Sequence, residues 1–374
     1  RAYGQTNPVF SATFEGFVNG ETTNVLGGTL VLSTTAETNS PVGVYPIEVT
    51  GVTSSNYDIT FQEGTLTVTP YALTVKADDK QKVYGQSDPA FTVSYTGFVN
   101  GQTESVLGGT LAFSRQPGEA VSSYTITPSG LTSSNYAITF ATGTLTISKA
   151  TLSVTPADAS RVYGDANPVF TGNIVGIQNS DNITANYTTT ATATSPVASY
   201  PITATLNDPD NKLGNYTVTL NSGTLSVTRA PLAVTAAGAS RLYGDANPVF
   251  NGTITGIRNS DNITASYNTS ATSASAVGSY DIVPTLNDPD SKLSNYDVTD
   301  VTLHNGTLTI NAAPLSISAD NKSRSYGAAN PSFTGSITGT RNSDNLSLSY
   351  NTSATANSPV GSYAIVPSVN DPDH

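Results

Sequence analysis

Apolar and polar residues alternate along many short stretches of this chain, with the two-residue period of β-strands. Roughly every 8 to 15 residues the alternation is interrupted by Gly, Pro, Asn or Asp, the residues that turns favour. The apolar faces of three such stretches are Leu73, Val75 and Ala77; Tyr57, Ile59 and Phe61; and Leu66 and Val68. The pattern predicts an all-β chain of short strands with very little helix.

The alternating stretches belong to a repeat of about 80 residues, a period that matches a small independent β domain and not a solenoid unit. Blocks related to GDANPVF, SPVGSY, SNY and GTLTV recur in the same order. The dipeptide Tyr-Gly begins at Tyr3, Tyr84, Tyr163, Tyr243 and Tyr326. The predicted repeats are 1–69, 70–148, 149–228, 229–311 and 312–374. The first lacks the opening strand of the other copies, and the fifth ends before its last two strands.

Six or seven short strands per repeat predict an antiparallel, immunoglobulin-like β-sandwich. A β-grasp repeat is the alternative, although no stretch has the helical pattern that it needs. Between repeats 1 and 2 only Thr69, Pro70 and Tyr71 separate two strand patterns. A link this short cannot act as a flexible coil, so the sequence predicts repeats joined end to end as a stiff rod.

The repeats fall into two subtypes. Repeats 1 and 2 carry GFVNG, at Gly16–Gly20 and Gly97–Gly101. Repeats 3 to 5 carry NSDN and NDPD blocks instead. The NSDN blocks begin at Asn179, Asn259 and Asn342, and the NDPD blocks begin at Asn207, Asn287 and Asn370.

In these blocks the chain resembles the MBG-type (YGX) tandem repeats of very large bacterial surface and adhesin-like proteins. The matching blocks are Tyr-Gly with NPxF, GFVNG, SPVGxY, SNY and GTLTV, and they cover essentially the whole chain. The last three repeats depart from the pattern where NSDN replaces GFVNG. The resemblance implies an extracellular, adhesion-associated scaffold without catalytic residues.

Composition narrows the range of partners. The chain has 15 basic and 27 acidic residues and a net charge of −12, so it cannot present the large basic face that nucleic acid requires. Cys, Met and Trp are absent, so each repeat must fold by burial and by contact with neighbouring repeats. No apolar run is long enough to span a membrane in this segment.

The sequence predicts no enzyme. A Ser-His-Asp arrangement needs a histidine, and the chain has only His304, expected in a hairpin turn, and the terminal His374. Neither zinc-ligand spacing nor a phosphate-binding loop is present.

Calcium is the one candidate ligand, because it prefers clustered carboxylate and amide oxygens. Ordinary turn formation by Asp-Pro-Asp, or pairing with Lys212 or Lys292, is the alternative. The candidate ligands are Asp208, Asp210, Asn211, Asp288, Asp290, Asp371 and Asp373, joined by Asp181, Asp261 and Asp344 if the loops meet.

The recurring Tyr-Gly predicts a packing tyrosine whose hydroxyl bonds to backbone, as in a tyrosine corner, rather than a sugar-binding residue. The leading hypothesis is therefore a stalk or spacer of a secreted bacterial surface adhesin or an extracellular matrix fibre. The alternative is an array of modules whose exposed loops bind glycans or host proteins. Neighbouring repeats are the expected partners, and exposed edge strands would also permit lateral self-association.

Overall fold

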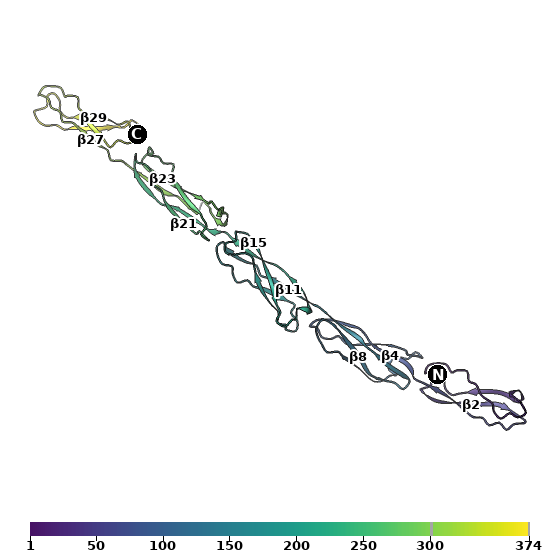
Figure 1. Ribbon diagram of the computed structural model, residues 1–374. Helices are drawn as coiled ribbons and strands as arrows, with labels where there is room; N and C mark the ends of the chain where they lie inside the picture. The colour runs from purple at the N-terminus through teal and green to yellow at the C-terminus, as the bar shows by residue number, and fades with distance from the viewer. Residues whose placement is uncertain (300–301, 373–374) are drawn as a thin grey trace. The chain divides into compact units, whose positions relative to one another are not determined.

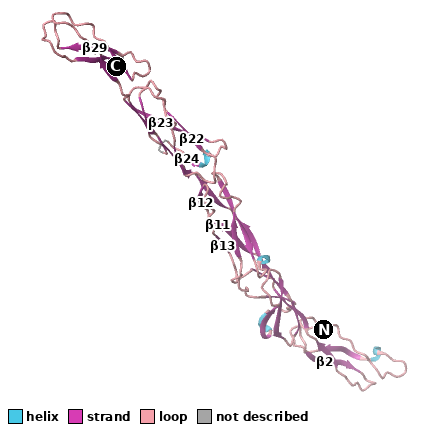
Figure 2. Ribbon diagram, turned by 60° about the vertical axis from the view of Figure 1, so that its left-hand side comes forward, coloured by secondary structure: helices cyan, strands magenta, loops and turns pink. Residues whose placement is uncertain are grey.

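A computed structural model describes residues 1–299 and 302–372, and strands and loops make up almost all of them (Figure 2). Within these residues helix is limited to four 3₁₀ turns. They are η1 (Thr23–Val25), η2 (Glu104–Val106), η3 (Leu213–Asn215) and η4 (Leu293–Asn295). The all-β prediction is confirmed, and the helix that a β-grasp repeat needs is absent from the described residues.

Repeat 2 shows a complete copy of the fold (Figure 1). Its strands are β4 (Tyr71–Ala77), β5 (Lys80–Val83), β6 (Val93–Thr96), β7 (Gly108–Arg115), β8 (Ser123–Thr132), β9 (Tyr136–Ala141) and β10 (Gly143–Ser148). They form a three-stranded sheet, β6-β4-β9, and a four-stranded sheet, β5-β10-β8-β7. β8 of the larger sheet contacts β4 and β9 of the smaller one, which makes a sandwich. The predicted sandwich class is confirmed, but β4 lies in the middle of its sheet, whereas the first immunoglobulin strand lies at an edge.

The first and last parts of repeat 2 run side by side in the same direction. β4 pairs in parallel with β9, and β5 pairs in parallel with β10. Both pass from the small sheet to the large one at the same level, where Asp79 Oδ1 accepts the N–H of Thr144 at 2.8 Å. Because the paths are parallel, the chain enters the repeat at one end, called here the entry end, and leaves at the opposite, exit end.

Repeats 3 and 4 have the same strand order. Repeat 3 has sheets β13-β11-β16 and β12-β17-β15-β14, and repeat 4 has β21-β19-β25, β18-β24 and β20-β26-β23-β22. Their strands are β11 (Ala150–Pro156), β12 (Ala159–Val162), β13 (Gly172–Val175), β14 (Thr184–Thr188), β15 (Ser199–Asn207), β16 (Tyr216–Leu220), β17 (Gly223–Thr228), β18 (Ala230–Pro231), β19 (Ala233–Ala236), β20 (Ala239–Leu242), β21 (Gly252–Thr255), β22 (Thr264–Asn268), β23 (Gly278–Asn287), β24 (Tyr296–Asp297), β25 (Leu303–His304) and β26 (Gly306–Asn311). Repeat 5 contributes β27 (Ser316–Ala319), β28 (Gly335–Thr338), β29 (Ser347–Thr352) and β30 (Ile365–Asn370).

Repeat 1 corrects one prediction. Its strands are β1 (Gly27–Ser33), β2 (Gly43–Thr53) and β3 (Gly64–Val68), in one sheet of order β1-β2-β3. The stretch from Tyr57 to Phe61, predicted as a strand, is not one. Its counterpart β9 is held by pairing with β4, and repeat 1 has no counterpart of β4 in this sequence. Residues 57–64 and 11–17 instead line a cavity of about 660 Å³.

The buried clusters cross the predicted repeat boundaries. One contains Ala77, Tyr84, Tyr124, Ile126, Leu145 and Ile147 from repeat 2 with Ala150, Leu152, Ile183 and Tyr216 from repeat 3. A second joins repeats 3 and 4, and a third joins repeats 1 and 2.

The contacts divide the chain into two compact units. The first comprises Arg1–Thr155, Gly172–Asn186 and Ala204–Asn221, and the second comprises Pro156–Thr171, Tyr187–Thr203 and the residues from Ser222 onward. This division passes through repeat 3, so each junction between successive repeats lies inside one unit.

The glycine that opens the GTLTV block provides a test of the sheet-changing bend. A Cβ on Gly143 would lie 2.5 Å from the carbonyl oxygen of Ala77, whereas a Cβ on Gly64 of repeat 1 would meet nothing closer than Ile47 Cβ at 3.6 Å. We expect Gly143→Ala to lower the local free energy of opening of repeat 2 by about 1–3 kcal/mol, because the backbone must shift. Hydrogen exchange of β4 and β10 amides measures it. Gly64→Ala is the matched control, and equal effects of the two changes on their own repeats would contradict the close approach.

Candidate functional site

The Tyr-Gly turn lies at the exit end of its repeat. Tyr84 follows β5, and its N–H bonds to the carbonyl of Ser148, the last residue of β10, at 2.9 Å. Gly85 has a φ of +85°, in the left-handed region that favours glycine. Tyr84 is 4% exposed and belongs to the cluster that repeats 2 and 3 share. The turn therefore directs the tyrosine into the next repeat.

The entry end of the next repeat presents a tight turn. In repeat 3 it runs from Gln178 to Asp181, closed by a 2.9 Å bond from the Asp181 N–H to the Gln178 carbonyl. Asn179 and Ser180 have φ of 51° and 57°, as a type I′ turn requires. The GFVNG block forms the same kind of turn, with Asn100 and Gly101 at these positions. The two subtypes are thus two sequences for one turn.

Two tyrosines from successive repeats meet on the last residue of this turn. The Tyr84 hydroxyl donates to Asp181 Oδ2 at 3.0 Å, and the Tyr216 hydroxyl donates to the same oxygen at 2.6 Å. The two rings pack edge to face, with centroids 5.5 Å apart. The Tyr216 hydroxyl also accepts the N–H of Gln178 at 2.9 Å. We call this arrangement of two tyrosines and a turn residue the tyrosine clamp.

The other junctions use the same clamp with small changes. Between repeats 3 and 4, Tyr163 and Tyr296 donate to Asp261 Oδ2 at 3.0 and 2.7 Å. Between repeats 4 and 5, the Tyr243 hydroxyl donates to Asp344 at 2.8 Å. Between repeats 1 and 2 the bridging residue is an amide. Gln102 donates to the Tyr3 hydroxyl at 2.9 Å and accepts from the Tyr136 hydroxyl at 2.6 Å.

The asparagine of the SNY block makes a second bond across each of the first three junctions. Asn215 Oδ1 accepts the backbone N–H of Val121, in the preceding repeat, at 2.9 Å. The equivalent bonds run from Val42 to Asn135 at 3.1 Å and from Val197 to Asn295 at 2.9 Å. The SNY block therefore supplies both an amide and a tyrosine to the junction.

Burial raises the pKa of three clamp tyrosines, Tyr163, Tyr216 and Tyr296. For Tyr216 burial is the largest cause and the hydrogen bond to Asp181 adds to it, raising the pKa to about 12. The pKa values of Tyr163 and Tyr296 are raised in the same direction, by burial first and then by Asp261. A phenolate beside the carboxylate of Asp181 or Asp261 would place two like charges together. The hydroxyls therefore stay protonated and act as donors.

The tyrosine-corner prediction assigned the role to the wrong residue. The Tyr84 hydroxyl bonds to a side chain of the next repeat and not to backbone. The tyrosine of the SPVGxY block makes the corner bond instead, since Tyr124 donates to the carbonyl of Ala120 at 2.8 Å and Tyr200 donates to that of Pro196 at 2.9 Å. Spacing could not separate the two tyrosines, because each occurs once per repeat.

The structure places the predicted calcium ligands in separate roles. Asp181, Asp261 and Asp344 accept the tyrosine hydroxyls described above. Asp208 accepts the backbone N–H groups of Lys212 and Leu213 at 2.9 and 2.8 Å, so it stabilises a turn. Asp288 accepts the equivalent N–H groups of Lys292 and Leu293. The side chains of Asp210 and Asp290 are exposed, and Asn211 is a left-handed turn residue.

Asp371 makes its own polar contact, and Asp373 lies outside the described residues. In the part of the chain that the structure describes, no three Asp, Glu, His or Cys residues gather around a common point. Calcium binding stays a prediction.

His304 does not lie in a hairpin. It ends β25, and the following strand, β26, belongs to the other sheet, so His304 lies at the bend between sheets. His374 lies outside the described residues. Within residues 1–299 and 302–372, no helix is long and apolar enough to cross a membrane.

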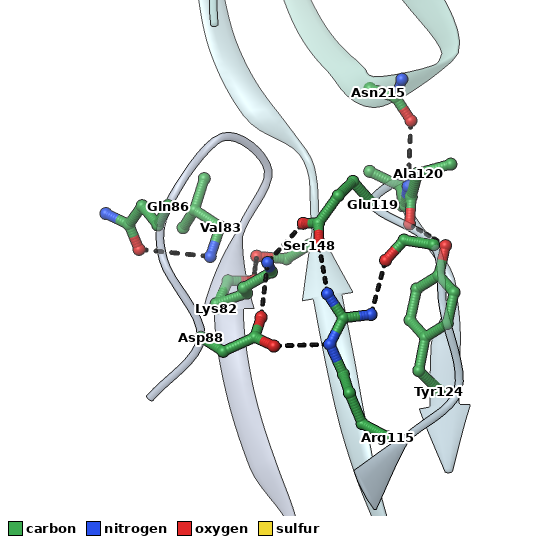
Figure 3. A network of polar contacts seen from close by, with 12 residues as sticks. Lys82, Val83, Gln86, Asp88, Arg115, Glu119, Ala120, Tyr124, Ser148 and Asn215 are labelled. Carbon is green, nitrogen blue, oxygen red and sulfur yellow. Dashed lines mark hydrogen bonds and ion pairs between the residues drawn. The ribbon is translucent and has the colours of Figure 1, made fainter. Parts of the chain in front are cut away.

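A charge network specific to repeat 2 fastens the Tyr-Gly turn to the loop before β8 (Figure 3). Lys82 Nζ lies 2.7 Å from Asp88 and 2.5 Å from Glu119, and the Lys82 side chain is only 3% exposed. Arg115 bridges the same two carboxylates. Burial alone would raise the pKa of Asp88, but hydrogen bonds from Lys82 and Arg115 outweigh it and hold the pKa below its usual value.

In the other repeats a simpler contact replaces the network. Arg161 of repeat 3 donates to Asn167 Oδ1 at 2.8 Å and also bonds to the carbonyl of Thr192. The shared feature is a cation that holds the turn carrying the clamp tyrosine. Both arrangements have a structural role, and neither brings a nucleophile and a base together.

The family comparison covers almost the whole chain. The model described as MBG domain (YGX type) matches residues 1–67, 73–146, 152–226, 232–309 and 315–372. No curated protein matches. The repeat boundaries predicted from the sequence, 1–69 through 312–374, stay predictions.

Several solved structures show a weak likeness. Drosophila N-cadherin EC1-4 matches at a TM-score of 0.23 and 8% identity, over 79% of this chain and 94% of that one. The N-terminal eight Ig domains of Down Syndrome Cell Adhesion Molecule match at 0.15 and 13%, over 85% and 51%. BT4661, a SusE-like surface located polysaccharide binding protein from Bacteroides thetaiotaomicron, matches at 0.16 and 9%, over 78% and 55%. Scores this low carry no argument about function.

The clamp predicts that one hydroxyl at a junction matters more than one within a repeat. Tyr296→Phe removes the bond to Asp261 and the acceptor of the Arg258 N–H, a 2.8 Å contact. We expect the local free energy of opening at this junction to fall by about 1.5–3 kcal/mol, as for bonds to charged groups. Hydrogen exchange of the Arg258 amide and its neighbours measures this free energy. Tyr280→Phe is the matched control, because its hydroxyl donates to the carbonyl of Ala276 in the same repeat. A larger effect from the control would contradict the clamp.

Alkaline pH should open the junction between repeats 2 and 3. The folded pKa of Tyr216, about 12, lies above the ordinary value of 10.0, so its contribution is fully present below pH 10 and lost as pH rises through about 12. Tyrosinate absorbance of the wild type minus that of Tyr216→Phe follows this residue, and thermal melts at each pH follow the stability. Titration of Tyr216 near pH 10 in the folded chain would contradict the prediction.

Proposed function

Since the chain belongs to the MBG domain family of YGX type, we propose that it is a segment of a stalk or spacer in a secreted bacterial surface protein. Its task in this proposal is to hold successive repeats in a fixed relation and so carry another part of the protein away from its anchor. The carrying observation is the tyrosine clamp, in which residues of two repeats share one hydrogen-bonded carboxylate.

Short links between repeats support the proposal. Only Lys149 separates β10 from β11, and only Arg229 separates β17 from β18. A link of one residue, with hydrogen-bonded strands on both sides, has little freedom to bend. The chain enters repeat 2 on one side and leaves it on the opposite side, so each added repeat extends the path of the chain.

An extracellular place and a non-enzymatic role are parts of the same proposal. The conserved blocks of the repeats are used for structure, because Tyr-Gly and SNY make the junction and GTLTV supplies core strands. The net charge of −12 favours solubility of a long repetitive chain. Lateral association through edge strands stays a prediction.

Small-angle X-ray scattering of the full chain tests the proposal. We expect the scattering of an elongated particle of low flexibility, because the clamps and short links restrict each joint. The Asp181→Ala, Asp261→Ala double variant, which removes the acceptor oxygens, should scatter as a more flexible particle, while circular dichroism shows that its repeats stay folded. A compact or freely flexible wild-type particle would overturn the stalk.

The same samples with added calcium test the metal prediction separately. A rise in both melting temperature and stiffness, abolished by Asp208→Asn and Asp288→Asn together, would support binding at these loops. Indifference to calcium would leave the stalk unchanged and remove the metal. Binding of a glycan or host protein by a wild-type chain that scatters as a flexible particle would favour the alternative of a binding array.

A further inference from the structure

Two facing positions at each junction vary in residue type: the residue that follows Tyr-Gly and the residue that precedes the turn asparagine. The place of these two positions at the junction stays the same. A Cβ on Gly164 would lie 2.6 Å from Arg258 Cβ, so the glycine of repeat 3 lies directly against this side chain of repeat 4. At the other three junctions the equivalent glycine lies equally close to Arg341, Gln178 or Val99. One position on the entry end therefore always faces the Tyr-Gly turn.

Two of the four junctions carry a charge pair at this place. Arg258 Nη1 lies 3.4 Å from Asp165 Oδ1, between repeats 3 and 4. Arg341 Nη1 lies 3.3 Å from Asp245 Oδ1, between repeats 4 and 5. In each case the aspartate is the residue directly after Tyr-Gly.

The other two junctions are neutral at the same positions. Gln86 follows Tyr-Gly in repeat 2, and Gln178 precedes the turn asparagine in repeat 3. Between repeats 1 and 2 the equivalent residues are Gln5 and Val99. Charge therefore occurs on both sides of a junction or on neither.

Stability alone does not explain the arginine. Its side chain in the Arg258 pair is 41% exposed and that of Asp165 is 47% exposed, a setting in which an ion pair stabilises little. The Arg258 Nε is buried and has no hydrogen-bond partner among the described residues, which is unfavourable. Charge pairs of this kind act mainly by excluding wrong partners, since an unmatched or like charge at an interface is costly.

We propose that these two positions form a recognition pair that favours docking of each exit end on a charge-matched entry end and disfavours docking on an entry end of the other kind. An exit end with Asp after Tyr-Gly accepts an entry end with Arg before the turn asparagine, and a neutral exit end accepts a neutral entry end. The partner is another repeat of the same family. This inference rests on the proposed function, because it assigns the specificity of the junction that holds the stalk together.

Hydrogen exchange of the full chain tests the pair at low ionic strength. Arg258→Asp places two carboxylates together, and we expect exchange of the amides around Tyr163 and residues 258–263 to become about five-fold faster. The swap Asp165→Arg, Arg258→Asp should restore exchange to within about two-fold of wild type. The neutral pair Asp165→Gln, Arg258→Gln, which copies the junction between repeats 2 and 3, should also stay within about two-fold.

Controls separate this inference from the proposed function. The junction between repeats 2 and 3 serves as an internal control, because its amides near Tyr84 and Gln178 should not change in any variant. High salt should reduce the effect of Arg258→Asp. An unchanged Arg258→Asp variant, or a swap that does not restore protection, would overturn the recognition pair. If Asp261→Ala still speeds exchange at the same junction, the clamp and the stalk stand without the recognition pair; if Asp261→Ala has no effect, the proposed coupling between repeats fails.

Discussion

A polar side chain that hydrogen-bonds to tyrosine hydroxyls across a junction is the interaction on which the junctions depend: the Gln102 amide at the first junction and an aspartate at the other three. A partly buried carboxylate is stabilised by hydrogen-bond donors, and Asp181 receives one hydrogen bond from Tyr84 and one from Tyr216. The donors come from different repeats, so neither repeat alone satisfies the group. These hydrogen bonds also require the tight turn that positions Asp181, and they require Gly85, whose left-handed backbone directs Tyr84 into the next repeat. Two of the recurring blocks, Tyr-Gly and SNY, therefore join one repeat to the next.

Much of the fold follows from local rules. Alternation placed Leu73, Val75 and Ala77 on one face, and all three are buried. The repeat period and the very low helix content also follow from residue patterns. The strand from Tyr57 to Phe61 does not form, because alternation reports which face a strand would bury and not whether a partner is present to pair with it. Strand formation at this position depends on a residue run far away in sequence, as the pairing of β4 with β9 shows in repeat 2.

The site was harder to predict than the fold. Tyr84 and Asp181 are 97 residues apart, more than one period, and a repeat read by itself suggests partners within the same copy. The signal that could have found the clamp is positional: the GFVNG and NSDN blocks occupy the same place in the repeat. In each, the residue that closes the turn, Gln102 or Asp181, can bridge two hydroxyls. The two blocks are one turn with two sequences, and that equivalence points to the residue that closes the turn.

The shared cores have a consequence for how such an array unfolds. Tyr84 shares one buried cluster with Ile183 and Tyr216 of repeat 3, so loss of that repeat would expose apolar surface on repeat 2. Stability is then distributed between repeats and junctions, as in nearest-neighbour models of repeat proteins, even though each copy is a sandwich of its own. Small domains without disulfides gain from this arrangement, because area buried at a junction adds to a thin core. The tyrosine that marks the repeat in the sequence thus contributes to the stability of two repeats at once.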